Sequence, residues 1–293
     1  MKATILGSGF GLYGYLPALI ACNVSVILPM RYQSIILQRP DLAHYYSLIE
    51  WAPSEDIILS QCDAIIIALP PAQQINLLKK CLGYSNLNYY LLEKPLAVSP
   101  SEANYILELM THSKKKFRIG YNFRWTDWGK TLLKQNNGLE EIIWEFHAHH
   151  YAKNIQTWKR FHKEGGGALR FYGIHLIALL AEIGYKNVLF SETIQSNEGE
   201  LESWTGILGG THLSNCRVTI HTHSMNSIFQ VKHNKNIYTF THPFEAARAE
   251  NNSIDMRVPY LISTLRDLLN DDRQSYDWYK QVNQLWQSIE EFA

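Results

Sequence analysis

Apolar and polar positions follow different periods in the two parts of the chain. In the first part, runs that are apolar nearly throughout, such as residues 3–6, 24–28, 63–69 and 89–92, alternate with stretches in which apolar residues recur every three or four positions. Continuous apolar runs are typical of strands buried on both faces, whereas the second spacing is typical of helices. The alternation predicts an α/β domain, residues 1–121, built on a Rossmann-like doubly wound parallel sheet.

The second part of the chain contains predicted strands whose side chains alternate between two faces. The longest such run covers residues 141–151, and shorter ones lie at residues 188–193, 203–208, 217–223, 228–232 and 236–241. Helices are predicted over residues 125–133, 168–183, 258–269 and 276–292, the last two being amphipathic and joining the domains. The series predicts an α+β domain, residues 122–293, with an open, mainly antiparallel sheet.

The composition excludes some classes of partner. Lysine plus arginine equals aspartate plus glutamate at 27 each, so no net field favours nucleic acid or an anionic membrane. The four cysteines are scattered without a CxxC pair, which favours reduced thiols, and neither a signal-peptide core nor a long apolar span is present. We therefore expect a soluble cytoplasmic protein that acts on a small molecule and binds neither nucleic acid nor membranes.

A glycine-rich segment links the first strand to the first helix. It consists of Gly7, Ser8, Gly9, Phe10 and Gly11. Gly7 permits a tight turn, Gly9 lets the backbone approach a pyrophosphate, and the next helix offers the N–H groups of its N-terminus to phosphates. The GxGxxG pattern is incomplete, because Leu12 stands where the third glycine is expected. The order of strand, glycine turn and helix predicts a dinucleotide-binding site.

The end of the second strand bears on the choice of cofactor. An acid about 20 residues beyond the glycines would bind the ribose hydroxyl of NAD. This chain has Met30 and Arg31 in that place, and an arginine suits the 2′-phosphate of NADP. The alternative is an ordinary arginine on a solvated loop. The sequence favours NADP and leaves NAD open.

Two further strand ends carry candidate site residues. Leu69 and Pro70 follow one apolar strand, and Glu93, Lys94 and Pro95 follow another. In open α/β sheets, ligands bind at the carboxyl ends of the strands. Taken alone, Glu93 and Lys94 would be interpreted as an exposed ion pair on a surface turn. Their place at a strand end makes them candidates.

Several short motifs occur in order along the chain. They are Gly7-Ser8-Gly9-Phe10-Gly11, Ala68-Leu69-Pro70-Pro71, Glu93-Lys94-Pro95, Gly120-Tyr121-Asn122-Phe123-Arg124, Gly165-Gly166-Gly167-Ala168-Leu169 and Gly173-Ile174-His175. With these motifs, the chain resembles the glucose-fructose oxidoreductase, inositol dehydrogenase and MocA (Gfo/Idh/MocA) family over almost its whole length. The resemblance implies an NAD(P)-dependent oxidoreductase that transfers a hydride between nicotinamide and a sugar, sugar derivative or cyclitol. The substrate would lie between the nucleotide fold and the open sheet.

The resemblance also implies roles for individual residues. Lys94 matches the lysine between nicotinamide and substrate, where its ammonium polarises a carbonyl or hydroxyl oxygen. His175 matches a histidine that serves as general acid or base, a role that suits an imidazole titrating near neutrality. Leu69, Pro70 and Glu93 would join Lys94, the glycine-rich segment and Arg31 in binding the cofactor. The alternatives are a structural salt bridge for Lys94 and a core position for His175.

The helix that carries His175 departs from the family pattern. The family commonly has an aspartate four residues before this histidine and another acid three residues after it, whereas this chain has Phe171 and Ala178. An acid–base group of this type contributes roughly 10²- to 10⁴-fold in rate, so its loss puts activity in question. Tyr172 is able to replace the missing hydrogen-bonding group, or else it packs on the sheet.

Residues around these motifs are candidates for contacting substrate. Arginine binds anionic groups such as phosphate or carboxylate, as proposed for Arg170, and aromatic rings suit stacking on sugars. The candidates are Tyr121, Arg124, Trp125, Tyr151, Trp158, Arg160, Arg170 and Phe171. His147 shares a strand face with His149, and His221 with His223, but no acid or cysteine completes a ligand set, so we expect no metal.

Two other functions stay open on the sequence. A protein that binds a dinucleotide and senses a ligand without catalysis is favoured by Phe171 and opposed by Lys94 and His175. A redox-neutral enzyme that uses bound NAD transiently has the same sequence features as a dehydrogenase. In each case we expect a homo-oligomer formed through the sheet of the second domain.

Overall fold

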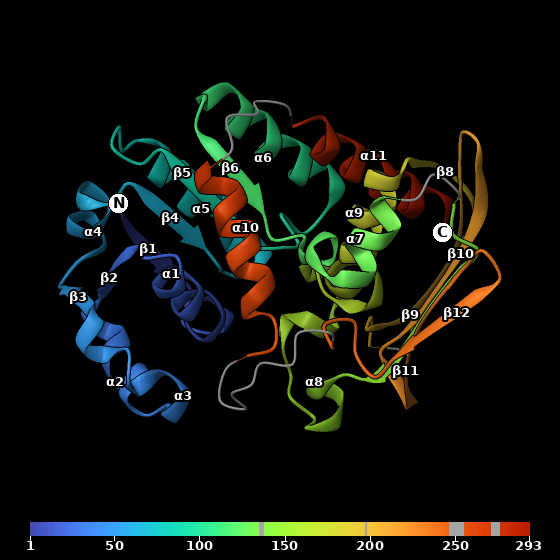
Figure 1. Ribbon diagram of the computed structural model, residues 1–293, viewed down its shortest axis with the longest axis horizontal. Helices are drawn as coiled ribbons and strands as arrows, with labels where there is room; N and C mark the ends of the chain where they lie inside the picture. The colour runs from blue at the N-terminus through green and yellow to red at the C-terminus, as the bar shows by residue number, and fades with distance from the viewer. Residues whose placement is uncertain (135–137, 197, 246–254, 271–275) are drawn as a thin grey trace. The chain divides into compact units, whose positions relative to one another are not determined.

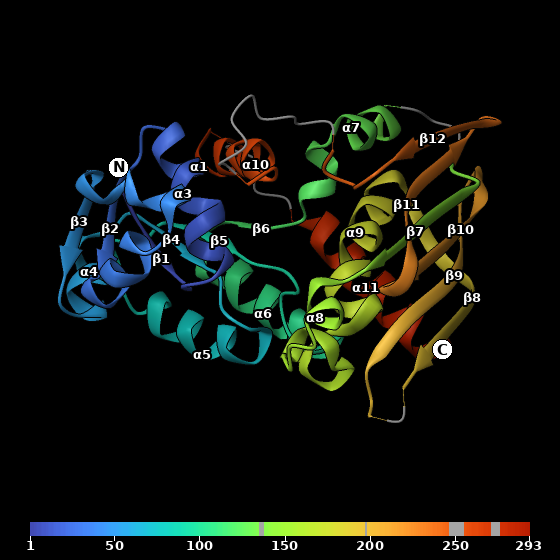
Figure 2. The same ribbon diagram turned by 90° about the horizontal axis from the view of Figure 1, so that it is seen from below.

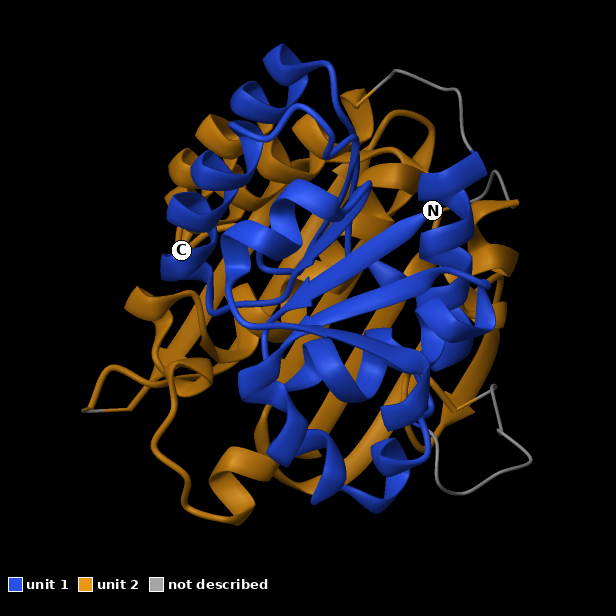
Figure 3. Cartoon of the chain, turned by 90° about the vertical axis from the view of Figure 1, so that its left-hand side faces the viewer, with its two compact units in different colours: residues 1–96, 108–122, 247–274 blue, residues 97–107, 123–246, 275–293 orange. Residues whose placement is uncertain are grey.

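The computed structural model of the chain describes residues 1–134, 138–196, 198–245, 255–270 and 276–293. Two compact units make up the chain (Figure 3). Unit 1 contains residues 1–96, 108–122 and 247–274, and unit 2 contains residues 97–107, 123–246 and 275–293. One junction between the units therefore lies next to the boundary expected at residue 121, but the chain passes between the units at several other points as well.

Unit 1 is built on six strands in the order β3-β2-β1-β4-β5-β6 (Figure 1). They are β1 (Lys2–Leu6), β2 (Ser25–Pro29), β3 (Ile49–Ala52), β4 (Ala64–Ile67), β5 (Tyr89–Leu92) and β6 (Lys116–Ile119). Every neighbouring pair is parallel, which confirms the doubly wound sheet. Because β1, β4 and β5 are neighbours, the segments that follow them leave the same edge of the sheet.

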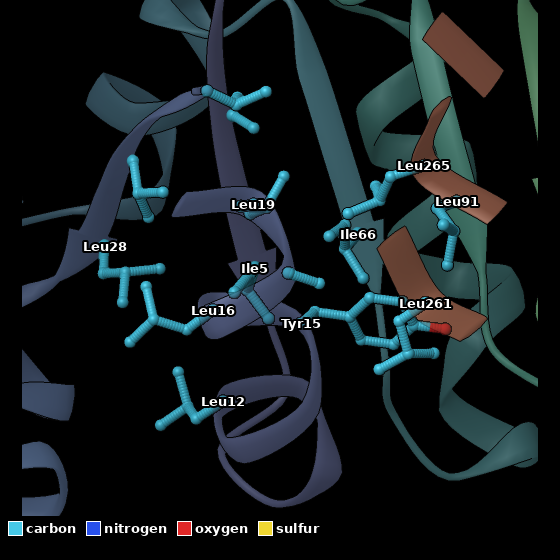
Figure 4. Close-up of a cluster of buried hydrophobic side chains, with 14 of the residues drawn as sticks. Ile5, Leu12, Tyr15, Leu16, Leu19, Leu28, Ile66, Leu91, Leu261 and Leu265 are labelled. Carbon is cyan, nitrogen blue, oxygen red and sulfur yellow. The ribbon is translucent and has the colours of Figure 1, made fainter. Parts of the chain in front are cut away.

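Helices connect these strands, and one more comes from the C-terminal part of the chain. They are α1 (Leu16–Ala21), α2 (Gln33–Leu37), α3 (Pro40–Ala43), α4 (Glu55–Gln61), α5 (Pro71–Leu82), α6 (Pro100–Ser113) and α10 (Val258–Asn270). Leu16 and Leu19 of α1 share a buried cluster with Ile66, Leu261 and Leu265 (Figure 4). Burying a side chain of this kind contributes about 1.5–3 kcal/mol. The core of unit 1 therefore includes residues from both ends of the chain.

Unit 2 is built on a second sheet of six strands in the order β12-β11-β7-β10-β9-β8. They are β7 (Glu141–His147), β8 (Tyr185–Gln195), β9 (Leu201–Gly210), β10 (Leu213–His221), β11 (His223–His233) and β12 (Asn236–Phe240). Only the pair β7 and β10 is parallel among the pairings of this sheet in the described residues. The sheet is therefore mixed and mainly antiparallel, as expected.

The strand predicted over residues 141–151 is too long. His147 pairs with His223 as the last residue of β7, and the N–H of Ala148 donates to the carbonyl oxygen of Thr222 at 2.8 Å. The chain then turns into a short helix, α8 (His149–Ala152). His147 and His149 therefore do not share a strand face, and His221 and His223 do not either, because β10 ends at His221 and β11 begins at His223. Both parts of the metal argument are corrected.

The helix predicted over residues 168–183 consists of two parts. A π-helical turn (Ala168–Gly173) runs directly into α9 (Ile174–Ile183), which ends at the left-handed Gly184. Figure 2 shows α9 with α11 (Asp277–Phe292) along one face of the sheet of unit 2. The predicted helix at residues 125–133 is α7 (Asp127–Leu133), and the hydroxyl of Thr126 accepts from the N–H of Gly129 at its start.

Candidate functional site

The glycine-rich segment leaves β1 through a turn that has no room for a side chain. Gly7 has a φ of 144°, and a Cβ atom there would lie 2.3 Å from the carbonyl oxygen of Ala68, just after β4. The N–H of Gly7 donates to the hydroxyl of the buried Tyr32 at 3.0 Å. The turn is thus fixed between β1, the end of β4 and the segment after β2, and only glycine fits its first position.

Gly9 has a different environment, because nothing lies within 4 Å of the position of its Cβ atom. Its carbonyl oxygen accepts the N–H of Leu12 at 3.0 Å, in the first turn of the helix. A π-helical turn (Gly11–Tyr15) then leads directly into α1. An open glycine at a helix N-terminus is the arrangement that lets a pyrophosphate approach the backbone.

The structure explains why the glycine pattern is incomplete. Leu12, in the place of the third glycine, is fully buried in the core of unit 1. A Cβ atom on Gly11 would lie 3.0 Å from the side chain of Ile5, and one on Gly14 would lie 2.5 Å from the ring of Phe10. The close packing that a third glycine usually permits is therefore provided by Gly11 and Gly14.

Arginines and aromatic rings surround the start of this helix. Arg257 places its guanidinium 4.1 Å from the ring centroid of Phe10 and donates from Nε to Asp255 at 2.8 Å. Arg39 lies 4.7 Å from the ring centroid of Tyr13. Arg257 and Tyr13 are 244 residues apart in the chain, so no local sequence pattern could have associated them.

Arg31, the candidate for a 2′-phosphate, lies directly after β2 in a short 3-10 turn (Met30–Tyr32). Its Nη2 donates to Oε1 of Glu55 at 2.5 Å, and its side chain is 54% exposed. The guanidinium is therefore at the surface of unit 1, at the strand end where a ribose phosphate binds in this type of fold, and Glu55 competes for it.

Glu93 follows β5 and is almost completely buried. Its Oε1 accepts from the hydroxyl of Tyr15, and its Oε2 accepts from the backbone N–H of Lys94 at 3.1 Å. Burial raises the pKa of Glu93, and burial together with the neighbouring carboxylate raises the pKa of Tyr15. The Glu93 carboxylate thus holds the main chain at Lys94, and its predicted cofactor contact stays a prediction.

Three of the predicted cofactor segments leave neighbouring strands of one sheet. The glycine-rich segment follows β1, Leu69 and Pro70 follow β4, and Glu93 and Lys94 follow β5. Leu69, Pro70 and Lys94 are partly exposed there, whereas Glu93 is turned inward. The structure thus brings these predicted residues together at the carboxyl edge of the sheet of unit 1. Lys94 lies in unit 1 and His175 in unit 2.

His175 lies in the first turn of α9 and is buried among aromatic rings. Its ring stacks on Phe123 with centroids 4.7 Å apart and meets Phe244 edge-on at 6.1 Å. The sequence argument missed both partners, although Phe123 stands in the motif that begins at Gly120. Stacking fixes the orientation of the imidazole in unit 2.

Phe171 stands where the resemblance to the Gfo/Idh/MocA family implies an aspartate. Its ring contacts Trp158 at 5.2 Å and Tyr172 at 4.8 Å between centroids, and the Lys159 ammonium lies 5.3 Å from its centre. Tyr172 in turn meets the ring of Trp144 at 5.7 Å. Trp158, Phe171 and Tyr172 are therefore brought together as an aromatic group beside the helix that carries His175.

The predicted substrate-binding arginines of unit 2 form ion pairs with acids of that unit. Arg170 binds Glu290 through Nε at 2.6 Å and Nη2 at 2.7 Å, Arg160 binds Glu200 at 2.7 Å, and Arg124 binds Glu182 at 2.6 Å. The Nη1 of Arg170 also donates to the carbonyl oxygens of Val98 and His162. These bonds give the three arginines a structural role, and their contacts with substrate stay predictions.

The other predicted positions are dispersed. Tyr121 is buried in unit 1, Trp125 lies under the guanidinium of Arg124, and Tyr151 stacks on His223 with centroids 4.7 Å apart. In the described residues there is no group of three or more histidine, cysteine or acidic side chains placed to hold a metal. Among the helices of the described ranges, none is long and apolar enough to cross a membrane.

Known proteins resemble this chain in sequence. Residues 4–121 match the model of GFO_IDH_MocA, described as an oxidoreductase family with an NAD-binding Rossmann fold. YteT of Bacillus subtilis (strain 168), which is named as an oxidoreductase, is 23% identical over 146 residues, which are 47% of this chain and 34% of that protein. This chain thus aligns with about a third of the length of that relative.

Solved structures resemble it in fold. A super-repressor mutant of Gal80p from Saccharomyces cerevisiae has a TM-score of 0.74 at 12% identity, with 99% of this chain and 94% of that chain covered. KijD10, a 3-ketoreductase from Actinomadura kijaniata in complex with NADP and TDP-benzene, has a TM-score of 0.69 at 11% identity, with 99% and 96% covered. At these identities the likeness shows the fold alone.

The sequence match covers the glycine-rich segment and the turns after β4 and β5, and the fold matches cover both sheets. Residues 4–121 match the Gfo/Idh/MocA oxidoreductase family as an NAD-binding Rossmann domain.

Proposed function

We propose that the protein is an NAD(P)-dependent oxidoreductase that transfers a hydride between nicotinamide and a sugar, sugar derivative or cyclitol. The observation that carries the proposal is the carboxyl edge of the sheet of unit 1. There the open Gly9 at a helix N-terminus and the partly exposed Lys94 follow strands β1 and β5, which flank β4. The 3-ketoreductase KijD10, whose solved complex contains NADP, supports a carbonyl or hydroxyl substrate.

The residues at this edge fit a dinucleotide. A side chain would fill the space in front of Gly9, and the helix that begins beyond it presents N–H groups and positive dipole to a phosphate. A bound nicotinamide would supply the acceptor or donor of hydride. Arg31 would hold a 2′-phosphate, and the absence of an acid at Met30 removes the usual partner of the NAD ribose hydroxyls, so NADP is the preferred cofactor.

Lys94 and His175 would share the proton chemistry. The Lys94 ammonium would donate a hydrogen bond to the substrate oxygen and stabilise the negative charge that develops on it. The His175 imidazole would give a proton to that oxygen during reduction, or take one during oxidation. Tyr172 is one turn away from His175 on the same helix and would orient a substrate hydroxyl.

Titration with NADPH and NADH, followed by protein fluorescence, tests the cofactor. Arg31→Ala should weaken NADPH binding by about 10- to 150-fold, since a charged hydrogen bond is worth about 1.5–3 kcal/mol, and should leave NADH binding nearly unchanged. Glu55→Gln is the matched variant, because it removes the competing carboxylate and should strengthen NADPH binding. Equal losses of affinity for both cofactors would show that Arg31 is a loop residue that does not contact a 2′-phosphate. The absence of binding to either cofactor would overturn the proposal.

Turnover of a panel of sugars, cyclitols and nucleotide sugars tests the chemistry. Lys94→Ala and His175→Ala should each lower kcat by about 10²-fold or more while dinucleotide affinity stays nearly unchanged, because both residues act mainly in the transition state. Tyr172→Phe should lower kcat less than either alanine substitution does. Full activity in either alanine variant would contradict the assigned role.

A ligand-sensing protein without catalysis is the second candidate. Phe171, packed between Trp158 and Tyr172 where the family commonly has an acid, favours it. The similarity in fold to the Gal80p super-repressor shows that this fold also occurs in a protein named as a repressor. Cofactor binding without hydride transfer to any member of the substrate panel would support this alternative.

A further inference from the structure

Gln74 lies in the first turn of α5, the helix that begins directly after Leu69 and Pro70. Its side chain is only 2% exposed. Its Nε2 donates to the carbonyl oxygen of Glu93 at 3.0 Å and to that of Pro95 at 2.8 Å. Because both acceptors are carbonyl oxygens, the amide must face them with its NH₂ end. The two hydrogens of one side chain thus bind the carbonyls on either side of Lys94.

These two carbonyls lie beyond the last residues of the strand ladder. The pairing of β5 with β6 ends at Leu92 and Ile119, followed by the N–H of Gly120 donating to the carbonyl oxygen of Leu92 at 2.9 Å. Buried carbonyl groups past the end of a sheet need other donors, and Gln74 supplies both. The N–H of Lys94 is bound by the Glu93 carboxylate at 3.1 Å, so the main chain is held on both sides of this residue.

We propose that Gln74 is the positioning residue for Lys94. By holding the carbonyls before and after Lys94, its amide sets the direction in which the ammonium leaves the turn. It also ties this turn to the start of α5, so that the segments after β4 and β5 stay in fixed relation at the cofactor edge of unit 1. This inference rests on the proposed role of Lys94. Gln74 itself touches neither reacting atom and acts through the lysine.

Replacement of the amide tests the inference. Gln74→Met keeps the length of the side chain and its helix propensity but removes both donors, and Gln73→Met makes the same change at the exposed neighbouring position. We expect Gln74→Met to lower kcat by about 10- to 100-fold, the effect of displacing a catalytic group by about 1 Å. KM and dinucleotide affinity should change by less than about threefold, since cofactor contacts are kept. Gln74→His keeps a single N–H donor, so its kcat should lie between that of the wild-type protein and that of Gln74→Met.

The reactivity of the Lys94 amine gives a readout that does not depend on turnover. The rate of acetylation by acetic anhydride is followed against pH by mass spectrometry, with Lys2 as an internal reference. Gln74→Met should change the rate and the apparent pKa at Lys94 but not at Lys2, and Gln73→Met should change neither. A purely structural role for Gln74 would lower stability without changing the Lys94 profile in the folded protein.

Two outcomes separate this inference from the proposed function. If Gln74→Met matches Gln73→Met both in kcat and in the Lys94 profile, the inference is overturned and the role of Lys94 is unaffected. If Lys94→Ala retains full turnover, the proposed function of Lys94 is overturned instead. Should Gln74→Met fold poorly, the same comparison is made with Gln74→His, whose remaining donor retains one of the two bonds.

Discussion

Gly7 and Gly9 lie two positions apart in one turn, yet a side chain has a different consequence at each. A Cβ atom on Gly9 meets nothing within 4 Å. Gly9→Val should therefore leave the free energy of unfolding within about 0.5 kcal/mol of the wild-type value, as at other surface positions. It should weaken NADPH and NADH binding by at least about tenfold, or 1.4 kcal/mol, because the side chain fills the space that a pyrophosphate would occupy.

Urea denaturation and fluorescence titration measure the two effects separately. Gly7→Val is the contrasting variant, since its φ of 144° and the carbonyl oxygen of Ala68 exclude a side chain, and it should lose stability before any effect on binding is measurable. Gly209→Ala in β9, whose Cβ atom would make only ordinary contacts, is the control. Wild-type affinity in a folded Gly9→Val variant would show that the dinucleotide does not approach this glycine.

His150 makes a prediction about acid stability. Burial, with Lys159 and Arg160 nearby, lowers the pKa of its imidazole to about 4, whereas the unfolded chain keeps a value of about 6.5. Between these values the unfolded state binds a proton that the folded state does not, so the free energy of unfolding falls as the pH drops from about 6.5 toward 4. The full effect is up to about 3 kcal/mol.

His150→Gln removes this proton uptake and should lose less stability than the wild-type protein between neutral pH and pH values near 4. Urea denaturation at both ends of that window measures it. His162, whose pKa burial also lowers to about 4, should behave in the same way when changed to glutamine. His112→Gln, at an exposed position of α6, is the control. Identical acid sensitivity in all three variants would contradict the prediction.

Among the elements of unit 1, strands β1, β2, β4 and β5 follow from the sequence because nearly all of their residues are buried, whereas β3, whose Glu50 is exposed, was not predicted. The strand over residues 141–151 was overextended for a physical reason. Alternation within one strand cannot tell where its partner stops pairing, and β11 pairs with β7 only as far as His147. The packing of Phe123 and Phe244 against His175 was equally inaccessible, because it depends on how distant segments of unit 2 come together.

Substitutions at Phe171 can distinguish an active enzyme from a ligand sensor without catalysis. Phe171→Asp would remove contacts with Trp158 and Tyr172 and place a carboxylate near the Lys159 ammonium. If the native pocket is active, sugar turnover should fall by about tenfold or more as the acid reorganises it, and the free energy of unfolding should fall by about 1–3 kcal/mol. Phe171→Leu keeps an apolar side chain and should lose less of both.

Steady-state kinetics and urea denaturation of the two variants decide between the functions. A gain of sugar oxidation in Phe171→Asp would contradict the expectation. It would show that an acid at this position produces an activity that the native sequence lacks. Unchanged turnover in both variants would show that this ring does not border the reacting substrate.

At the scale of the whole molecule, the order of the motifs can be read from the sequence. Which later segments of the chain join each unit cannot. The junction near residue 121 was visible as a change of period, whereas the assignment of α10 to unit 1 and α11 to unit 2 was not. Both helices are amphipathic, and the apolar stripe of a helix does not identify the surface against which it packs. Arg257, which is bound by Asp255, reaches Phe10 of the glycine-rich segment from a distant part of the chain, so it was absent from the predicted site.

The sheet of unit 2 supports a proposal about assembly. Trp144 of β7 packs on Tyr172, so its neighbours Glu141, Ile143 and Glu145 alternate onto the opposite face. Glu141 pairs with both Lys232 and Arg217 across the strands, and Ile143 pairs with Gln230. A face that carries charges of both signs beside apolar groups can be complementary to a second copy of itself, and self-complementarity is what a twofold interface needs. We therefore propose that a second copy of the chain packs there.

Sedimentation equilibrium at several protein concentrations tests this assembly. Ile143→Arg places a charge in the middle of the proposed interface, where an unpaired buried charge costs several kcal/mol, and should convert a dimer or higher oligomer into monomers. Leu48→Arg is the matched control, because Leu48 is an apolar residue of unit 1 with 56% of its surface exposed, and it should leave the assembly unchanged. A wild-type monomer at all concentrations, or an oligomer that survives Ile143→Arg, would show that this face does not join two copies.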